Sequence, residues 1–260
     1  MIGVFDSGVG GLTVLAEIRR RLPDADLIYV GDHAAAPYGE RSLESVADRC
    51  RLVSDWLVGE GCRVITVACN TASAAALHSL RARHPDVAFV GMEPAVKPAA
   101  STTRAGRVGV VATAATFQGE LFATAVERFA ADIDVYSAAC PEWVRLVEEG
   151  QLDGAAVEEA VERCLRPLIA QRIDVLVLAC THYPALAPVI ARCLGPEVQI
   201  VDPSPAVARQ TERVSGPAAM GTSQTRLLST GDVTGLRRAA ARLGFRQPTT
   251  LLPLDEHGPT

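Results

Sequence analysis

Short apolar runs rich in β-branched residues alternate along the chain with stretches in which apolar residues recur at helical spacing. Residues 2–5 form the first run, a loop with three glycines follows at residues 6–11, and residues 12–22 carry apolar side chains at the spacing of a helix. Strands that are apolar throughout, each followed by a helix, are typical of parallel sheets covered on both faces. The pattern therefore predicts an α/β fold.

The predicted strands fall into two series that begin alike. They are residues 2–5, 26–30, 64–67, 87–90, 107–111, 133–137, 174–178, 198–201, 226–230 and 249–252. Ile2-Gly3-Val4 opens the first series, Val108-Gly109-Val110 opens the second, and each series later places an Ala-Cys pair after a strand. We expect two pseudo-symmetric domains, each a mainly parallel sheet flanked by helices, with the active site in the cleft between them. The expected domains are residues 1–95 plus 206–260, and residues 96–205.

Composition narrows the classes of partner. A net charge of −5 argues against nucleic acid, whose affinity for proteins comes mainly from basic contacts to phosphate. No apolar stretch has the length of a membrane span, and residues 1–6 lack the features of a signal peptide, so we expect no membrane contact. The seven cysteines are odd in number and widely spaced, which predicts free thiols and a cytoplasmic location.

Two of these cysteines stand at matched positions. Cys69 and Cys180 each follow a predicted buried strand and precede a helical segment. Ligands of such sheets bind beyond the carboxyl ends of the strands, so the two thiols are expected to face one cleft. Free amides at helix starts favour a thiolate and also an anionic ligand. Two thiols on opposite sides of a carbon acid can remove and return a proton with inversion, and Asp6 and His182 are the neighbours able to adjust their ionisation.

The same residues could also indicate a metal site or a nucleotide-binding loop. Cys69, Cys140, Cys180 and His182 could supply four metal ligands, but paired Cys-x-x-Cys spacing is absent, and we predict no metal. The glycines of residues 8–11 match neither the dinucleotide nor the phosphate-loop pattern, so their expected role is to let the backbone approach a small ligand.

Four motifs in order carry a family resemblance. Asp6-Ser7-Gly8-Val9-Gly10-Gly11, Pro37-Tyr38-Gly39, Ala68-Cys69-Asn70-Thr71-Ala72-Ser73 and Cys180-Thr181-His182-Tyr183-Pro184 together resemble glutamate racemase, within the aspartate/glutamate racemase superfamily. The resemblance covers essentially the whole chain. It implies that the chain interconverts L- and D-glutamate with no cofactor. The reaction would supply D-glutamate for peptidoglycan biosynthesis and hence for cell wall biogenesis and cell shape.

The resemblance also implies roles for individual residues. Cys69 deprotonates D-glutamate, Cys180 deprotonates L-glutamate, and Asp6, Glu148 and His182 match the auxiliary acid/base groups. The substrate-contacting positions are Asp6, Ser7, Pro37, Tyr38, Gly39, Asn70, Thr71, Thr113, Thr116, Thr181 and His182. The chain departs from the family at Ala112-Thr113, where Gly-Thr is usual.

The alternatives are an aspartate or hydantoin racemase of the same superfamily, or a non-catalytic protein that binds an acidic ligand or DNA gyrase. Gyrase enters by family analogy only, because no residue predicts it. A homodimer is a further expectation that the sequence does not specify.

Overall fold

The chain folds as alternating strands and helices, and the computed structural model describes residues 1–216 and 221–254. The strands are β1 Ile2–Asp6, β2 Leu27–Gly31, β3 Val64–Val67, β4 Ala88–Gly91, β5 Arg107–Ala112, β6 Asp134–Ala139, β7 Val175–Ala179, β8 Gln199–Val201, β9 Thr225–Ser229 and β10 Thr249–Leu251. The α-helices are α1 Leu12–Arg21, α2 Leu43–Gly59, α3 Asn70–Arg83, α4 Val96–Thr102, α5 Ala114–Gln118, α6 Glu120–Phe129, α7 Pro141–Glu149, α8 Ala155–Ala170, α9 Ala187–Leu194, α10 Ser204–Ser215 and α11 Val233–Arg242. Short 3-10 helices are η1 His33–Ala35, η2 Tyr38–Glu40 and η3 Tyr183–Leu186. None of the helices in these ranges is long and apolar enough to span a membrane.

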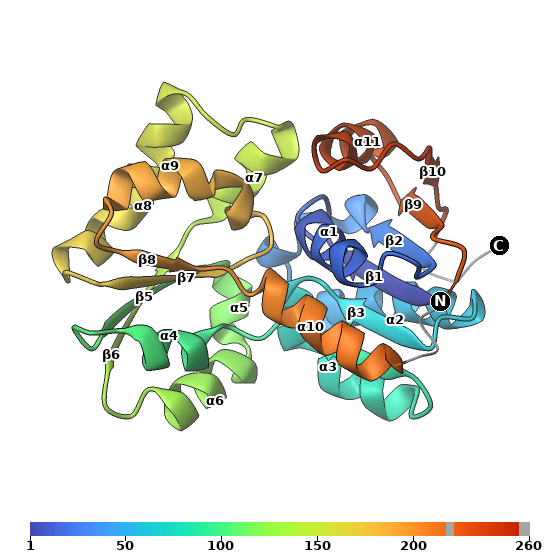
Figure 1. The fold of residues 1–260 in the computed structure, drawn as a ribbon, viewed down its shortest axis with the longest axis horizontal. Helices are drawn as coiled ribbons and strands as arrows, with labels where there is room; N and C mark the ends of the chain where they lie inside the picture. The colour runs from blue at the N-terminus through green and yellow to red at the C-terminus, as the bar shows by residue number, and fades with distance from the viewer. Residues whose placement is uncertain (217–220, 255–260) are drawn as a thin grey trace.

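The strands form two parallel sheets, which lie in separate lobes (Figure 1). The first sheet has the order β10-β9-β2-β1-β3-β4 and the second the order β6-β5-β7-β8. The order β2-β1-β3-β4 of the first lobe recurs as β6-β5-β7-β8 in the second. The predicted α/β class and its two mainly parallel sheets are confirmed, and the repeated strand order is what an internal duplication produces.

The two central strands carry equivalent glycines. Gly3 on β1 pairs between Ile28 and Ile65, and Gly109 on β5 occupies the matching position in the second sheet. A Cβ at either glycine would press on apolar side chains of the covering helix, such as Leu57 over the first sheet and Leu168 over the second. Each glycine therefore lets a helix pack closely on its sheet.

The last part of the chain adds to the first sheet rather than starting a new one. β9 pairs with β2, and β10 pairs with β9. Residues 217–220 and 255–260 belong to the expected returning segment 206–260 and lie outside the described residues. The domain limits stay predictions.

Alternation along the strands separates the two faces of the first sheet, because successive side chains point to opposite sides. Ile2 and Val4 pack with α1, α10 and α11, whereas Phe5 packs with α2 and α3. The α1 side is continuous with the part of the second lobe under α7, α8 and α9, since one apolar cluster contains both Leu15 and Trp143. The lobes thus share a core along one side of the cleft.

One expectation about the cysteines is wrong. Cys140 and Cys164 form a disulfide, with their Cα atoms 6.0 Å apart, a separation within the usual range for such bonds. Packing of α8 beside the end of β6 brings them together, which their separation of 24 residues does not reveal. Cys50, Cys62, Cys69, Cys180 and Cys193 are free thiols, as predicted.

Candidate active site

The carboxyl ends of the central strands face one pocket. Its lining contains most of the residues that the sequence singled out: Ser7, Pro37, Tyr38, Gly39, Cys69, Asn70, Thr71, Thr113, Thr116, Cys180, Thr181 and His182. Asp6 and Glu148 do not line it but contact residues that do. Residues from β1, β3, β5 and β7 therefore meet at one place, as expected for the ends of parallel strands.

Cys69 occupies the first side of the pocket. It caps the N-terminus of α3, a helix of 14 residues, and its Sγ accepts a hydrogen bond from the amide of Ala72 at 3.4 Å. The side chain is buried, with 6% exposure. Burial, reinforced by the charge of Asp6, raises the pKa of the Cys69 thiol despite the two backbone amides that favour its thiolate. The Cys69 side is therefore poised as a proton donor.

Cys180 occupies the opposite side, directly after β7. Its Sγ lies 3.7 Å from His182 Nδ1, and His182 Nε2 lies 2.6 Å from Glu148 Oε1. Burial acts to lower the pKa of His182, but the neighbouring Cys180 and Glu148 outweigh it and hold that pKa well above its ordinary value. The thiol, imidazole and carboxylate form a line in which a proton on His182 is stabilised from both sides.

Glu148 is anchored from several directions. Its Oε1 also accepts the amide hydrogen of Val9 at 2.9 Å, which links α7 to the glycine loop of the first lobe. Burial acts to raise the pKa of Glu148, but His182, His33 and the Val9 amide together lower it well below its usual range. The carboxyl group is thus held ionised.

Asp6 joins the lobes behind the pocket. Its Oδ1 accepts from the amide of Gly8 at 2.8 Å, and its Oδ2 accepts from the hydroxyl of Thr181 at 2.9 Å. Burial is the largest influence and raises the pKa of Asp6, although His182 and these hydrogen bonds oppose it. Asp6 is therefore the more easily protonated of the two carboxyl groups.

The glycine loop has no room for side chains. A Cβ at Gly8 would collide with the Glu148 carboxyl group, and a Cβ at Gly10 would lie 2.5 Å from His182 Nδ1. The loop backbone can therefore pack directly against both groups. The approach of this backbone to a small ligand stays a prediction.

Hydroxyl groups close the pocket across the cleft. Thr71 Oγ1 lies 2.9 Å from Thr113 Oγ1 and 3.3 Å from Thr116 Oγ1. Thr71 follows β3 and the other two follow β5, so these contacts join the lobes. Asn70 is 3% exposed, and neither polar atom of its side chain has a hydrogen-bond partner in the described residues. Such an amide is suited to bind a polar ligand.

Tyr38 contributes its ring rather than its hydroxyl. The hydroxyl donates to Asp32 Oδ2 at 2.6 Å, and Arg49 pairs with Asp32 Oδ1 at 2.7 Å. Burial raises the pKa of Tyr38 well above its ordinary value, so the phenol is neutral. Tyr38 is therefore tied to this buried pair while Pro37 and Gly39 line the pocket beside it.

Some functional positions escaped sequence reasoning. Glu40, Pro141 and Val144 line the pocket, and His33 contacts Glu148. Glu40 adjoins the Pro37-Tyr38-Gly39 motif, and His33 stands just after β2, so the strand-end rule could have found both. Pro141 and Val144 carry no such signal, because their positions depend on how α7 is oriented.

Many residues that line the pocket carry a polar group, but few of them can carry charge. Among the described residues that line it, none is Lys or Arg, and Glu40 and His182 alone can carry charge at neutral pH apart from the thiols. Residues at the starts of α3 and α5 line the same space, and helix starts are a setting that favours a carboxylate ligand. Within the described ranges no group of three or more His, Cys, Asp or Glu side chains has the arrangement of a metal site.

This fold is that of a racemase family. Residues 7–211 match the model of the Asp/Glu/Hydantoin racemase family, and the chain belongs to that family. A glutamate racemase from Pseudomonas paraeruginosa is 49% identical over 219 residues, covering 84% of this chain and 83% of the relative.

Solved structures give the same answer. A glutamate racemase from Bacillus anthracis has a TM-score of 0.88 at 34% identity, covering 98% of this chain and 97% of the other. One from Francisella tularensis, in complex with D-glutamate, has a TM-score of 0.86 at 29% identity and covers 98% and 97%. The resemblance to glutamate racemase seen in the sequence is confirmed.

Proposed function

We propose that this chain interconverts L- and D-glutamate without a cofactor, using Cys69 and Cys180 as its two bases. One observation carries the proposal: two buried thiols from opposite lobes line a single pocket in a member of this racemase family. The relatives named glutamate racemase, and the related structure that holds D-glutamate, support glutamate as the substrate.

The pocket suits an amino acid with two carboxylates. The hydroxyls of Thr71, Thr113 and Thr116 and the amide of Asn70 offer neutral donors, and the helix starts offer backbone amides. Neutral donors bind a carboxylate without giving the site a large net positive charge. The carbanion that forms at Cα then acquires its stabilisation from the carboxylate beside it and from these fixed dipoles.

The reaction balances with the two thiols alone. A Cys180 thiolate removes the Cα proton of L-glutamate, and the electron pair of that bond stays on the substrate as a carbanion. The Cys69 thiol then gives its proton to the opposite face, which yields D-glutamate, a Cys69 thiolate and a Cys180 thiol. The reverse reaction begins from that state. The burial that raises the pKa of Cys69 keeps it protonated for the first direction.

Each neighbour has a role in this scheme. Asp6 adjusts the charge near Cys69, and His182 with Glu148 adjusts it near Cys180. We further propose that the product serves peptidoglycan biosynthesis in the cytoplasm. Rescue of a D-glutamate auxotroph by this chain, and failure of the same rescue by a Cys69→Ala variant, tests that supply role. The homodimer stays an expectation, and a DNA gyrase partner stays a prediction by family analogy only.

The deciding experiment follows Cα labelling and optical rotation in deuterated water, first with L-glutamate and then with L-aspartate. A two-base racemase places solvent deuterium mainly in the product enantiomer during early turnover. Equal early labelling of substrate and product contradicts the assigned bases. Faster turnover of aspartate makes the chain an aspartate racemase, and no exchange with either amino acid favours a binding protein.

A further inference from the structure

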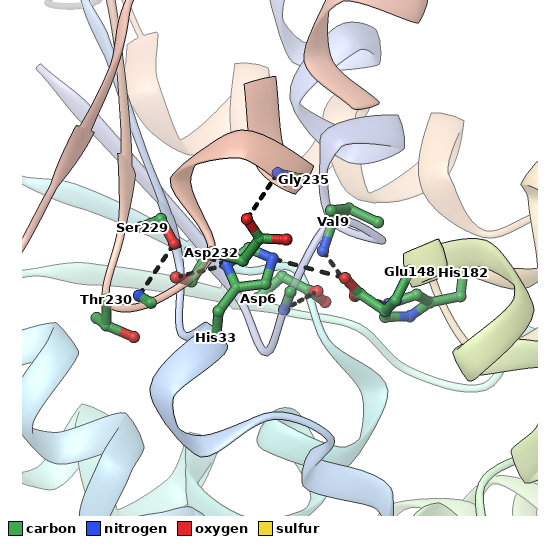
Figure 2. A network of polar contacts seen from close by, with 12 residues as sticks. Asp6, Val9, His33, Glu148, His182, Ser229, Thr230, Asp232 and Gly235 are labelled. Atoms are coloured by element: carbon green, nitrogen blue, oxygen red, sulfur yellow. Dashed lines mark hydrogen bonds and ion pairs between the residues drawn. The ribbon is translucent and has the colours of Figure 1, made fainter. Parts of the chain in front are cut away.

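His33 extends the line of contacts that ends at Cys180. It lies just after β2, and its side chain is only 7% exposed. Its Nδ1 lies 2.9 Å from Ser229 Oγ and 3.2 Å from the carbonyl of Gly31, and its Nε2 lies 3.5 Å from Glu148 Oε2 (Figure 2). His33 therefore spans from β9 of one lobe to a carboxylate of the other.

Glu148 is held by a different imidazole at each oxygen. His182 contacts Oε1, together with the Val9 amide, and His33 faces Oε2. The Val9 amide and His182 both bind Oε1, so neither of them restrains Oε2 directly. The second imidazole gives the other oxygen a separate partner, so the orientation of the carboxylate toward His182 is fixed.

We propose that His33 is a positioning residue for the half of the reaction that Cys180 performs, a role that rests on the proposed function. His33 holds Glu148, Glu148 holds His182, and His182 lies beside the Cys180 sulfur. His33 does not touch the pocket, so it acts only through this line.

The surroundings of His33 favour its protonated form. Burial acts to lower the pKa of His33, but Glu148 from α7, the Gly31 carbonyl and the charge of Asp6 from β1 outweigh it, and the net shift is upward. Asp232, which is also labelled in Figure 2, accepts the Gly235 amide at 2.8 Å at the start of α11. As an imidazolium, His33 pairs by charge with Glu148, whose Oε2 lies 3.5 Å from Nε2 without the geometry of a hydrogen bond, and it donates from Nδ1 toward Ser229 or Gly31.

A cation at His33 also limits how strongly Glu148 favours a proton on His182. Both imidazoles draw on one negative charge, so a neutral residue at position 33 leaves the whole charge to His182. The proton on His182 then becomes harder to remove, and the carboxylate that orients it becomes looser. Both effects act on Cys180 through its direct neighbour His182, whereas Cys69 is reached only indirectly, through the charge of Asp6.

The test uses kinetic isotope effects in the full-length His33→Asn variant. L-glutamate deuterated at Cα reports the barrier at Cys180, and D-glutamate deuterated at Cα reports the barrier at Cys69. We expect kcat/KM to fall about 10-fold in both directions, because the enantiomers have equal free energy and the ratio of the two values cannot change. We expect the isotope effect on kcat/KM to rise for the L substrate and to fall for the D substrate.

Two further variants serve as controls. Ser229→Ala removes one of the two partners of Nδ1 and leaves the Gly31 carbonyl, so it should shift the isotope effects in the same sense by a smaller amount. His78→Gln, at an exposed position on α3, should leave both isotope effects at their wild-type values. Isotope effects that are unchanged in His33→Asn, or that change equally for the two enantiomers, overturn the proposal.

A measurement that does not depend on turnover separates this proposal from the function on which it rests. NMR titration of the His182 ring should show its pKa rising by about one unit in His33→Asn. An unshifted His182 overturns the positioning role even in an active enzyme. If the His182 pKa differs between the wild type and His33→Asn but the wild type does not racemise glutamate, the proposed function is overturned, and the role of His33 in the half-reaction with it.

Discussion

The two thiols stand at equivalent places in two copies of one fold, yet they are supported differently. Cys69 caps a helix of 14 residues and accepts an amide hydrogen bond from it. Cys180 precedes a 3-10 helix of four residues and has an imidazole 3.7 Å away. A short 3-10 helix offers a weaker dipole than a long α-helix. The second half of the site therefore relies on side chains for what backbone dipoles provide in the first.

The largest expected effect comes from removing either thiol. Cys69→Ala and Cys180→Ala should each lower racemisation by at least about 10³-fold, because each direction needs one sulfur as base and the other as acid. Rates from optical rotation, with circular dichroism and urea unfolding to check the fold, measure this. An active single variant refutes the pairing and makes the structural comparison irrelevant to catalysis.

Removing the supporting groups should reveal the asymmetry. His182→Asn and Asp6→Asn should each lower kcat/KM by about 10²-fold. The isotope effect should rise with Cα-deuterated L-glutamate in the first variant, because the barrier at Cys180 has grown. It should rise with Cα-deuterated D-glutamate in the second, because the barrier at Cys69 has grown. If both variants change the isotope effects of the two enantiomers in the same way, His182 and Asp6 do not support different thiols.

A buried ion pair supports the loop beside the Cys69 half. Asp32 is fully buried and binds Arg49, the Tyr38 hydroxyl and the Thr230 hydroxyl. Asp32→Ala should lower the free energy of unfolding by about 3 kcal/mol, since Arg49 loses its partner while largely buried. The matched variant at an exposed pair with Arg83, Asp55→Ala, should cost less than about 1 kcal/mol. Urea unfolding measures both, and equal costs contradict the support assigned to Asp32.

The smallest effect concerns the pH dependence of stability. The lowered pKa of Glu148 adds stability above the ordinary value of 4.5, which is lost as pH falls below it. The raised pKa of Asp6 has the opposite sign, because stability is lost as pH rises above 3.8 and the carboxyl ionises. Glu148→Gln should therefore reduce acid sensitivity by roughly 1–2 kcal/mol near pH 3 to 5, and Asp6→Asn should increase it. Urea unfolding across that pH range measures the free energy of unfolding of each variant. If both variants change its pH dependence in the same direction, the assigned signs are wrong.

The positions of the two thiols were predictable from the sequence, because the residues that follow parallel strands gather at one edge of the sheet. Cys69, Thr113 and Cys180 follow apolar runs, and parallel strands bring such positions to one edge. The supports were harder to predict. Glu148 and His33 reach the site through the orientation of α7 and a turn after β2, and the Cys140–Cys164 disulfide depends on how α8 packs. Long-range packing of this kind leaves no local periodic signal.

Hydrogen bonds cross the cleft and tie the assembly of the site to the closed arrangement of the lobes. Thr71 with Thr113, Asp6 with Thr181 and Val9 with Glu148 each join the lobes, and each involves a site residue or its direct support. A swing of the lobes wide enough to admit substrate severs these bonds and disassembles the acid/base machinery in the same movement. Water that enters the open cleft thus meets an unassembled catalyst, and the chemistry becomes available only to a molecule already enclosed.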